Sequence, residues 1–182
     1  MKLIITGTSR KNSLSSITAK IVQKIYKDLD EEVEILDLKE IPFESIIKEP
    51  YSPEVPPSLK TYLNKVSQST AIILICPEYN GGIPGLIKHF IDHWVYPDSF
   101  VYKPICFIGL GGKFGALNPI SHLESIFLYR HSFVFPLRVF IQNVSQIIKE
   151  DKIVDKNINQ LLLNQAKNFI KFVQALKTQN FE

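Results

Sequence analysis

Short apolar runs alternate with amphipathic stretches along almost the whole chain, and this alternation limits the possible folds more than any other feature. The runs have the length of strands, and those that are apolar throughout suit strands covered on both faces. They cover Lys2–Thr6, Val33–Leu38, Ala71–Cys76, Pro104–Leu110 and Leu137–Ile141. After each run, apolar residues recur at spacings of three and four, as on the buried face of a helix. This pattern predicts an α/β fold, with a five-stranded parallel sheet, right-handed crossovers and helices on both faces.

Two details refine this prediction near the end of the chain. A helix is expected near Ala116–Arg130, and a long final helix carries apolar residues from Ile158 to Leu176. Because proline cannot donate a ladder hydrogen bond, Pro136 favours an edge position for the strand at Leu137–Ile141.

The length of 182 residues suits a single domain over 1–182 with one core. Pro50–Pro57 is therefore interpreted as a surface loop, because the chain before it is too short for a complete domain. No apolar run approaches the ~20 residues of a membrane span. The N-terminal MKLIITGTSR lacks the apolar stretch and cleavage site of a secretory signal. We expect a cytoplasmic protein with no membrane partner.

Charge and thiol content exclude several other classes. The net charge is +3 and the 21 Lys and Arg residues are scattered, whereas a nucleic-acid binder gathers them into a patch. Cys76 and Cys106 lie in apolar runs, so we expect buried, reduced thiols. His89 and His93 have the i,i+4 spacing of metal ligands, but no third ligand is indicated nearby. We expect no nucleic acid and no metal.

Three loops have the composition of a ligand site. In an open parallel sheet, ligands bind beyond the carboxyl ends of the strands. The first loop, GTSRKNSLS from Gly7, leads from a strand into a helix, whose free N–H groups and dipole favour an anion. Arg10 and the hydroxyl groups suit a phosphate. The loop matches neither GxGxxG nor a Walker sequence, and an N-capping turn with solvated charges explains its spacing equally well.

The second and third loops are rich in glycine. The second, PEYNGGIPG from Pro77, has paired glycines that allow backbone N–H groups to approach a flat ligand, or form a tight turn before a helix begins at Pro84. The third, GLGGKFG from Gly109, nearly matches GxGxxG, with Phe114 at the place of the last glycine. We expect it to form one wall of a planar ligand's pocket.

These loops resemble one family. GTSRKNSLS, PEYNGGIPGLIKHFIDHW and GGKFGALNPISHL are similar, in order and spacing, to sequences of the NADPH-dependent FMN reductase family. That family includes azoreductases, quinone reductases and chromate reductases. The resemblance covers nearly the whole chain, and PEYNGG(I)PG is its most specific part. Thr8 stands where the family usually has Ser and Ser15 where it often has Asn; both replacements keep a polar group.

The resemblance implies a flavodoxin-like three-layer sandwich with strand order 2-1-3-4-5, bound FMN, and NADPH or NADH as co-substrate. It implies that the cofactor-binding residues of the first loop are Thr8, Ser9, Arg10, Ser13, Leu14 and Ser15. Those around the isoalloxazine are Pro77, Glu78, Tyr79, Asn80 and Gly81, with Gly111 and Gly112 completing the pocket. It also implies a homodimer or a dimer of dimers through the helices after the third and fourth strands. Trp94 and Phe127 are candidate contacts there, with burial in their own core as the alternative.

The expected activity is hydride transfer from NAD(P)H through FMN to an electron-poor acceptor such as a quinone, an azo compound, a metal ion or free flavin. Because the flavin carries the hydride, no side chain is an obligatory catalyst, and backbone N–H groups at Asn80, Gly81 and Gly82 are expected to stabilise negative charge. One alternative is a flavodoxin-type electron carrier, although such carriers are usually acidic. Another is a scaffold that has lost flavin, which has little need of the second loop.

Overall fold

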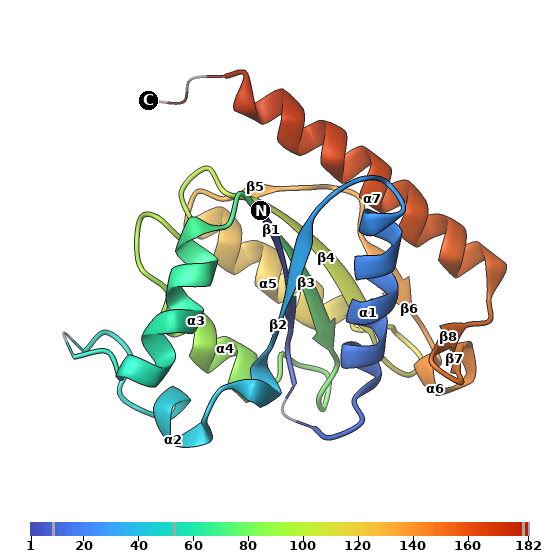
Figure 1. Ribbon diagram of the computed structural model, residues 1–182. Helices are drawn as coiled ribbons and strands as arrows, with labels where there is room; N and C mark the ends of the chain where they lie inside the picture. Colours follow the sequence, from blue (N-terminus) through green and yellow to red (C-terminus); the bar gives the residue numbers. More distant parts are fainter. Residues whose placement is uncertain (9, 53, 180, 182) are drawn as a thin grey trace.

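The computed structural model describes residues 1–8, 10–52, 54–179 and 181 and shows a sheet between two layers of helices (Figure 1). The parallel sheet has the order β2-β1-β3-β4-β5, and β6 also pairs with β4. Its strands are β1 (Lys2–Thr6), β2 (Val33–Asp37), β3 (Ala71–Pro77), β4 (Pro104–Leu110), β5 (Phe133–Val134) and β6 (Val139–Ile141). The sheet order confirms the predicted 2-1-3-4-5 arrangement.

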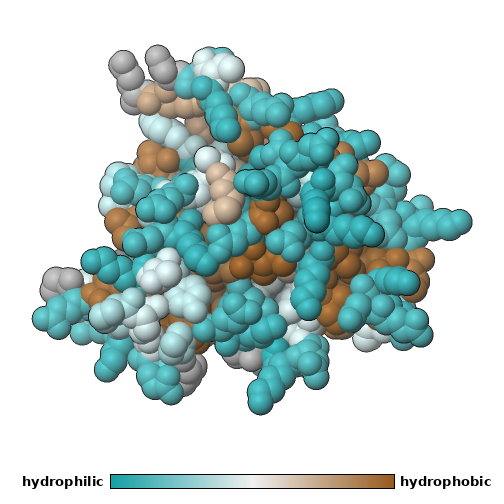
Figure 2. Space-filling view, in the orientation of Figure 1, coloured by the Kyte–Doolittle hydropathy of each residue, from teal (hydrophilic) through white to brown (hydrophobic). Residues whose placement is uncertain are grey.

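Two helices cover one face of the sheet, and three shorter ones cover most of the other. The first pair is α1 (Leu14–Lys27) and α7 (Lys156–Lys177), and their apolar residues pack with those of β1, β3 and β4. The opposite face is covered by α3 (Pro57–Gln68), α4 (Gly85–Asp92) and α5 (Leu117–Tyr129). Each central strand is therefore covered on both sides, which explains its continuous apolar sequence. Figure 2 shows polar side chains over much of the visible surface, with apolar ones exposed between them.

Smaller elements complete the fold. They are the 3-10 helix η1 (Leu38–Glu40), α2 (Phe43–Ile46), α6 (Val144–Ile147), and the antiparallel pair β7 (Ile148–Lys149) and β8 (Lys152–Ile153). Both cysteines are free and buried, as expected, and burial raises the pKa of Cys76 to about 12. No helix among the described residues is long and apolar enough to cross a bilayer.

The fifth strand differs from its prediction. Instead of one strand at Leu137–Ile141, two short segments, β5 and β6, pair with β4, and Pro136 lies between them. Proline has no N–H for the ladder, so a continuous strand cannot form through this position. The buried Gln165 side chain bridges the gap, since its amide donates to the carbonyls of Phe107 (2.9 Å) and Leu137 (2.7 Å).

Candidate cofactor site

A cleft of about 230 Å³ opens at the carboxyl ends of β1, β3 and β4, where the three unusual loops meet. It is lined by Thr8, Arg10, Asn12, Ser13, Leu14, Ser15, Pro77, Glu78, Tyr79, Leu110, Gly111, Gly112 and Val144. Most of the residues predicted for the site therefore lie around one cleft. Ser9, also predicted, lies outside the described residues.

The first loop presents the polar end of the cleft. Ser13 is the N-cap of α1 and its hydroxyl accepts the N–H of Ser15 at 3.1 Å. The first turn of α1 has no acidic residue, so nothing in that turn opposes an anion at this positive helix end. Among the described residues, no carboxylate forms an ion pair with Arg10. Its guanidinium is thus available to a phosphate.

A pair of side chains joins the first loop to the second. Thr8 Oγ1 lies 2.8 Å from Tyr79 Oη and also accepts the backbone N–H of Arg10 at 3.1 Å. Thr8 is only 1% exposed. Its hydroxyl therefore fixes both the start of the phosphate loop and the Tyr79 ring.

The second loop turns sharply at its tip. Tyr79 and Gly82 exchange backbone hydrogen bonds of 3.1 and 2.9 Å, and the two residues between them, Asn80 (φ 50°) and Gly81 (φ 76°), are left-handed. These features are those of a type I′ turn, which favours Asn-Gly. Asn80 and Gly81 do not line the cleft, and the N–H of Gly82 is used within the turn. The glycine at 81 thus serves the turn itself, with open space where a Cβ would point.

The third loop forms the opposite wall. A Cβ at Gly112 would meet no atom within 4 Å, so this stretch of backbone is open to a ligand. The wall is completed by Val144 of α6, because the N–H groups of Asn143 and Val144 donate to the carbonyls of Gly112 (2.8 Å) and Gly111 (3.1 Å).

Three lining residues were not predicted from the sequence. Leu110 ends a predicted strand and Asn12 lies inside the predicted first loop, with a left-handed backbone (φ 55°) that asparagine tolerates. Both could have been found from their positions. Val144 carries no such signal, since only the hydrogen bonds of its segment to the third loop bring it to the cleft.

The two ends of the cleft differ in chemistry. One end offers a helix N-terminus, hydroxyls and a guanidinium that has no ion-pair partner among the described residues, and the other offers open backbone at Gly112 together with Pro77 and Tyr79. The fold is that of a doubly wound α/β protein, and the cleft lies where such proteins bind their ligands, with groups suited to a phosphate-bearing planar cofactor.

Comparison with known proteins identifies the family. The model of the NADPH-dependent FMN reductase family matches residues 1–146. An FMN-dependent NADPH-azoreductase of Staphylococcus aureus is 33% identical over 127 residues, which are 68% of this chain and 67% of the relative. The chain belongs to the NADPH-dependent FMN reductase family. It is an oxidoreductase with FMN as cofactor and NADPH as co-substrate.

Solved structures agree on the fold. FerB, a flavoenzyme NAD(P)H:acceptor oxidoreductase from Paracoccus denitrificans, superposes with a TM-score of 0.77 at 23% identity, over 96% of this chain and 97% of that one. A flavodoxin from the domain Archaea gives 0.62 at 10% identity, over 96% and 99%. These similarities confirm the predicted flavodoxin-like fold.

His89 and His93, which have the spacing of metal ligands in the sequence, contact each other in the structure. His93 Nε2 lies 3.1 Å from the carbonyl of Ile46, and the His89 and His93 rings meet edge-on with centroids 5.1 Å apart. Burial lowers the pKa of His93. Within the described part of the chain, no group of three or more His, Cys, Asp or Glu side chains is placed to hold a metal ion.

Proposed function

We propose that the cleft holds FMN and that the enzyme works by a ping-pong cycle in this one cleft. When bound, FMN would take a hydride from NADPH and pass its electrons to an electron-poor acceptor, such as a quinone, an azo compound, a metal ion or free flavin. The observation that supports this most is the convergence of three loops, distant in sequence, on one cleft with a cationic end and a flat end. The azoreductase relative makes azo compounds the first acceptors to test.

In this proposal the first loop binds the phosphate. Arg10 donates in a bidentate manner, and the hydroxyls of Ser13 and Ser15 with the free N–H groups of α1 complete the anion site. Thr8 orders this loop through the N–H of Arg10. The assignment of Ser9 to the same site rests on the family pattern alone.

The second and third loops bind the ring. Pro77, Tyr79, Gly111 and Gly112 form its walls. The N–H of Gly82 already donates to Tyr79, so the N–H groups of Asn80 and Gly81 are the ones left to stabilise negative charge at the rim. The protein would position the cofactor and exclude water, without an acid or base of its own in the hydride step.

The test is the visible spectrum of the purified protein with added FMN, followed by NADPH without oxygen. Bound-flavin absorbance that bleaches with NADPH, and returns when an azo dye or quinone is added, supports the cycle. Bound flavin that stays oxidised with both NADPH and NADH would favour the electron-carrier alternative. Stopped-flow traces in which the acceptor must bind before NADPH oxidation would contradict the ping-pong order.

We further propose that the protein is a homodimer through the face formed by α4 and α5. Trp94 and Phe127 are 5% and 1% exposed, so they belong to the core of one subunit and are not contacts. Nearby, Tyr96 and Tyr129 are exposed and both rings lie beside the Arg130 guanidinium, at 5.5 and 5.6 Å. Such an aromatic patch fits an interface.

Sedimentation analysis of the wild type and of Tyr129→Asp tests this face. A dimer that dissociates in the variant supports it, and a wild-type monomer at micromolar concentration contradicts it. The buried free thiols of Cys76 and Cys106 accord with a reducing compartment, and we propose the cytoplasm.

A further inference from the structure

The carboxylate of Glu78 connects two loops that are distant in sequence. Glu78 follows β3, and its Oε2 accepts the backbone N–H of Ala116 at 3.1 Å, across 38 positions of sequence. The Glu78 N–H also donates to the carbonyl of Leu110 at 2.9 Å. The side chain and the backbone N–H of Glu78 therefore both hydrogen bond to the segment that runs from β4 through the third loop into α5.

The hydrogen bond supplies a cap that α5 lacks. Ala116 is the N-cap of α5, with φ 70° and no side-chain cap, and the first turn contains no acidic residue. In a capping box, a Glu or Gln at the third helical position accepts the N–H of the N-cap residue. That position is Pro119, which has no such group. Glu78 performs this function from another loop and places a negative charge at the positive end of the helix.

Gly111 leaves the space that this bond needs. A Cβ at residue 111 would lie 2.7 Å from Glu78 Oε2 and 2.9 Å from the Ala116 N, the two atoms that the bond joins. Any side chain there would push the two apart. The absence of a Cβ at Gly111 is thus explained by the carboxylate of Glu78.

We propose that Glu78 is a positioning residue whose carboxylate holds the second loop against the third loop and so fixes the distance between the two walls of the ring pocket. Glu78 and Gly111 both line the cleft, and Ala116, at the other end of the bond, is the N-cap of the helix that follows the third loop. The family pattern places Glu78 beside the flavin, whereas the structure gives its side chain a distinct role in setting the pocket. This inference rests on the proposed FMN site.

The experiment compares FMN affinity, by fluorescence titration of flavin-free protein, in the wild type, Glu78→Ala, Glu78→Gln and Gly111→Ala. Gln keeps a carbonyl oxygen that can accept the Ala116 N–H, so Glu78→Gln is expected to bind FMN within about threefold of the wild type. Glu78→Ala and Gly111→Ala are each expected to weaken FMN about tenfold or more, in the range of one lost charged hydrogen bond. The visible circular dichroism of the bound flavin should change in Glu78→Ala and return in Glu78→Gln.

The double variant and a matched control complete the test. Because both substitutions break one contact, Glu78→Ala with Gly111→Ala should weaken FMN no more than the stronger single variant. Glu124→Ala removes a carboxylate of α5 itself, which pairs with Arg138 at 2.9 Å and lies outside the cleft, and should leave FMN affinity unchanged. Wild-type affinity in Glu78→Ala, or losses that multiply in the double variant, would overturn the positioning role. If Glu78→Ala fails to fold, the FMN affinities of Gly111→Ala and Glu78→Gln test the positioning role instead. A wild type that binds no FMN would refute the proposed function instead.

Discussion

Thr8 Oγ1 and Tyr79 Oη, 71 positions apart in sequence, lie 2.8 Å apart and hydrogen bond at the base of the cleft. The same Thr8 oxygen accepts the Arg10 N–H. One buried hydroxyl therefore orders the group that would bind the phosphate and the ring that would border the isoalloxazine. This relationship makes the two halves of the site depend on each other.

Thr8→Val, which keeps the shape but removes the hydroxyl, is expected to weaken FMN binding more than Tyr79→Phe does. The valine variant loses both hydrogen bonds, whereas the phenylalanine variant loses only the bond to Thr8. A neutral hydrogen bond contributes about 0.5–1.5 kcal/mol, so Tyr79→Phe should raise the Kd about twofold to tenfold. Titration of flavin-free protein measures both, and a larger effect of Tyr79→Phe would contradict the central role of Thr8.

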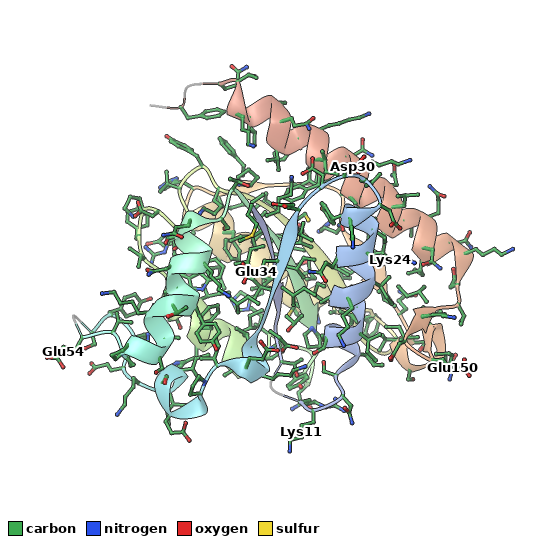
Figure 3. The ribbon with its side chains drawn as sticks, in the orientation of Figure 1. Lys11, Lys24, Asp30, Glu34, Glu54 and Glu150 are labelled. Atoms are coloured by element: carbon green, nitrogen blue, oxygen red, sulfur yellow. The ribbon has the colours of Figure 1, made fainter. Side chains whose placement is uncertain are left out.

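Arg10→Ala is expected to weaken FMN about tenfold to a few hundredfold and to change riboflavin binding little, because a charged hydrogen bond to phosphate is absent in riboflavin. Lys11→Ala is the matched control. Lys11 lies in the same loop but does not line the cleft, and Figure 3 shows its side chain pointing away from the body of the protein. Equal losses of FMN and riboflavin in Arg10→Ala would mean that Arg10 does not bind phosphate.

Gln165→Leu is expected to lower the free energy of unfolding by about 1–3 kcal/mol, because it leaves the buried carbonyl of Phe107 and the half-buried carbonyl of Leu137 without their amide partner. Urea denaturation at neutral pH measures this. Gln160→Leu, on the exposed side of the same helix, is the control and should change stability by less than about 0.5 kcal/mol. A similar small effect at both positions would show that the broken strand does not need the glutamine.

The sequence predicts the bounds of the central strands accurately because these strands are buried on both faces. β1 and β4 match their predicted bounds, Lys2–Thr6 and Pro104–Leu110, and strands covered on both faces have an apolar sequence that no surface element shares. The prediction for the last strand was wrong in extent: β5 and β6 lie on either side of Pro136, and the carbonyls of Phe107 and Leu137 are bound by Gln165 from a distant helix. The sequence near Pro136 does not indicate that Gln165 is their partner.

In the candidate site, too, residues with a local sequence signal were predicted, and those brought in by contacts between distant segments were missed. Thr8, Arg10 and Ser13 were predicted from a polar loop between a strand and a helix together with the resemblance of that loop to one family, and they line the cleft in the structure. Val144 was missed because backbone hydrogen bonds between loops, with no side-chain signature, bring it there. The capping role of Glu78 toward Ala116 was missed for the same reason: the α5 start lacks a cap in its own sequence, and the replacement comes from 38 positions away.

The buried Lys103 provides a pH-dependent prediction. Its ammonium donates to the carbonyls of Val66, Ser67 and Ser69 at the end of α3, at 3.1, 2.7 and 2.8 Å. Burial nevertheless lowers the pKa of Lys103 to about 8, below the ~10.4 of an unfolded lysine. Between about pH 8 and 10 the unfolded chain therefore binds more protons at this residue than the folded chain does. The contribution of Lys103 to the free energy of unfolding should increase as the pH rises through that window.

Urea denaturation at pH 7, 8, 9 and 10 of the wild type and of Lys103→Met measures this contribution. The variant lacks the titrating group but keeps an apolar stem of similar length, so other groups that titrate in alkali cancel in the difference. Lys103→Met should be less stable at every pH because three carbonyls lose their donor, and its deficit should widen by about 2 kcal/mol between pH 7 and 10, following about 1.4 kcal/mol per pKa unit. A constant deficit would show that the three carbonyls at the end of α3 keep the ammonium charged in spite of its burial.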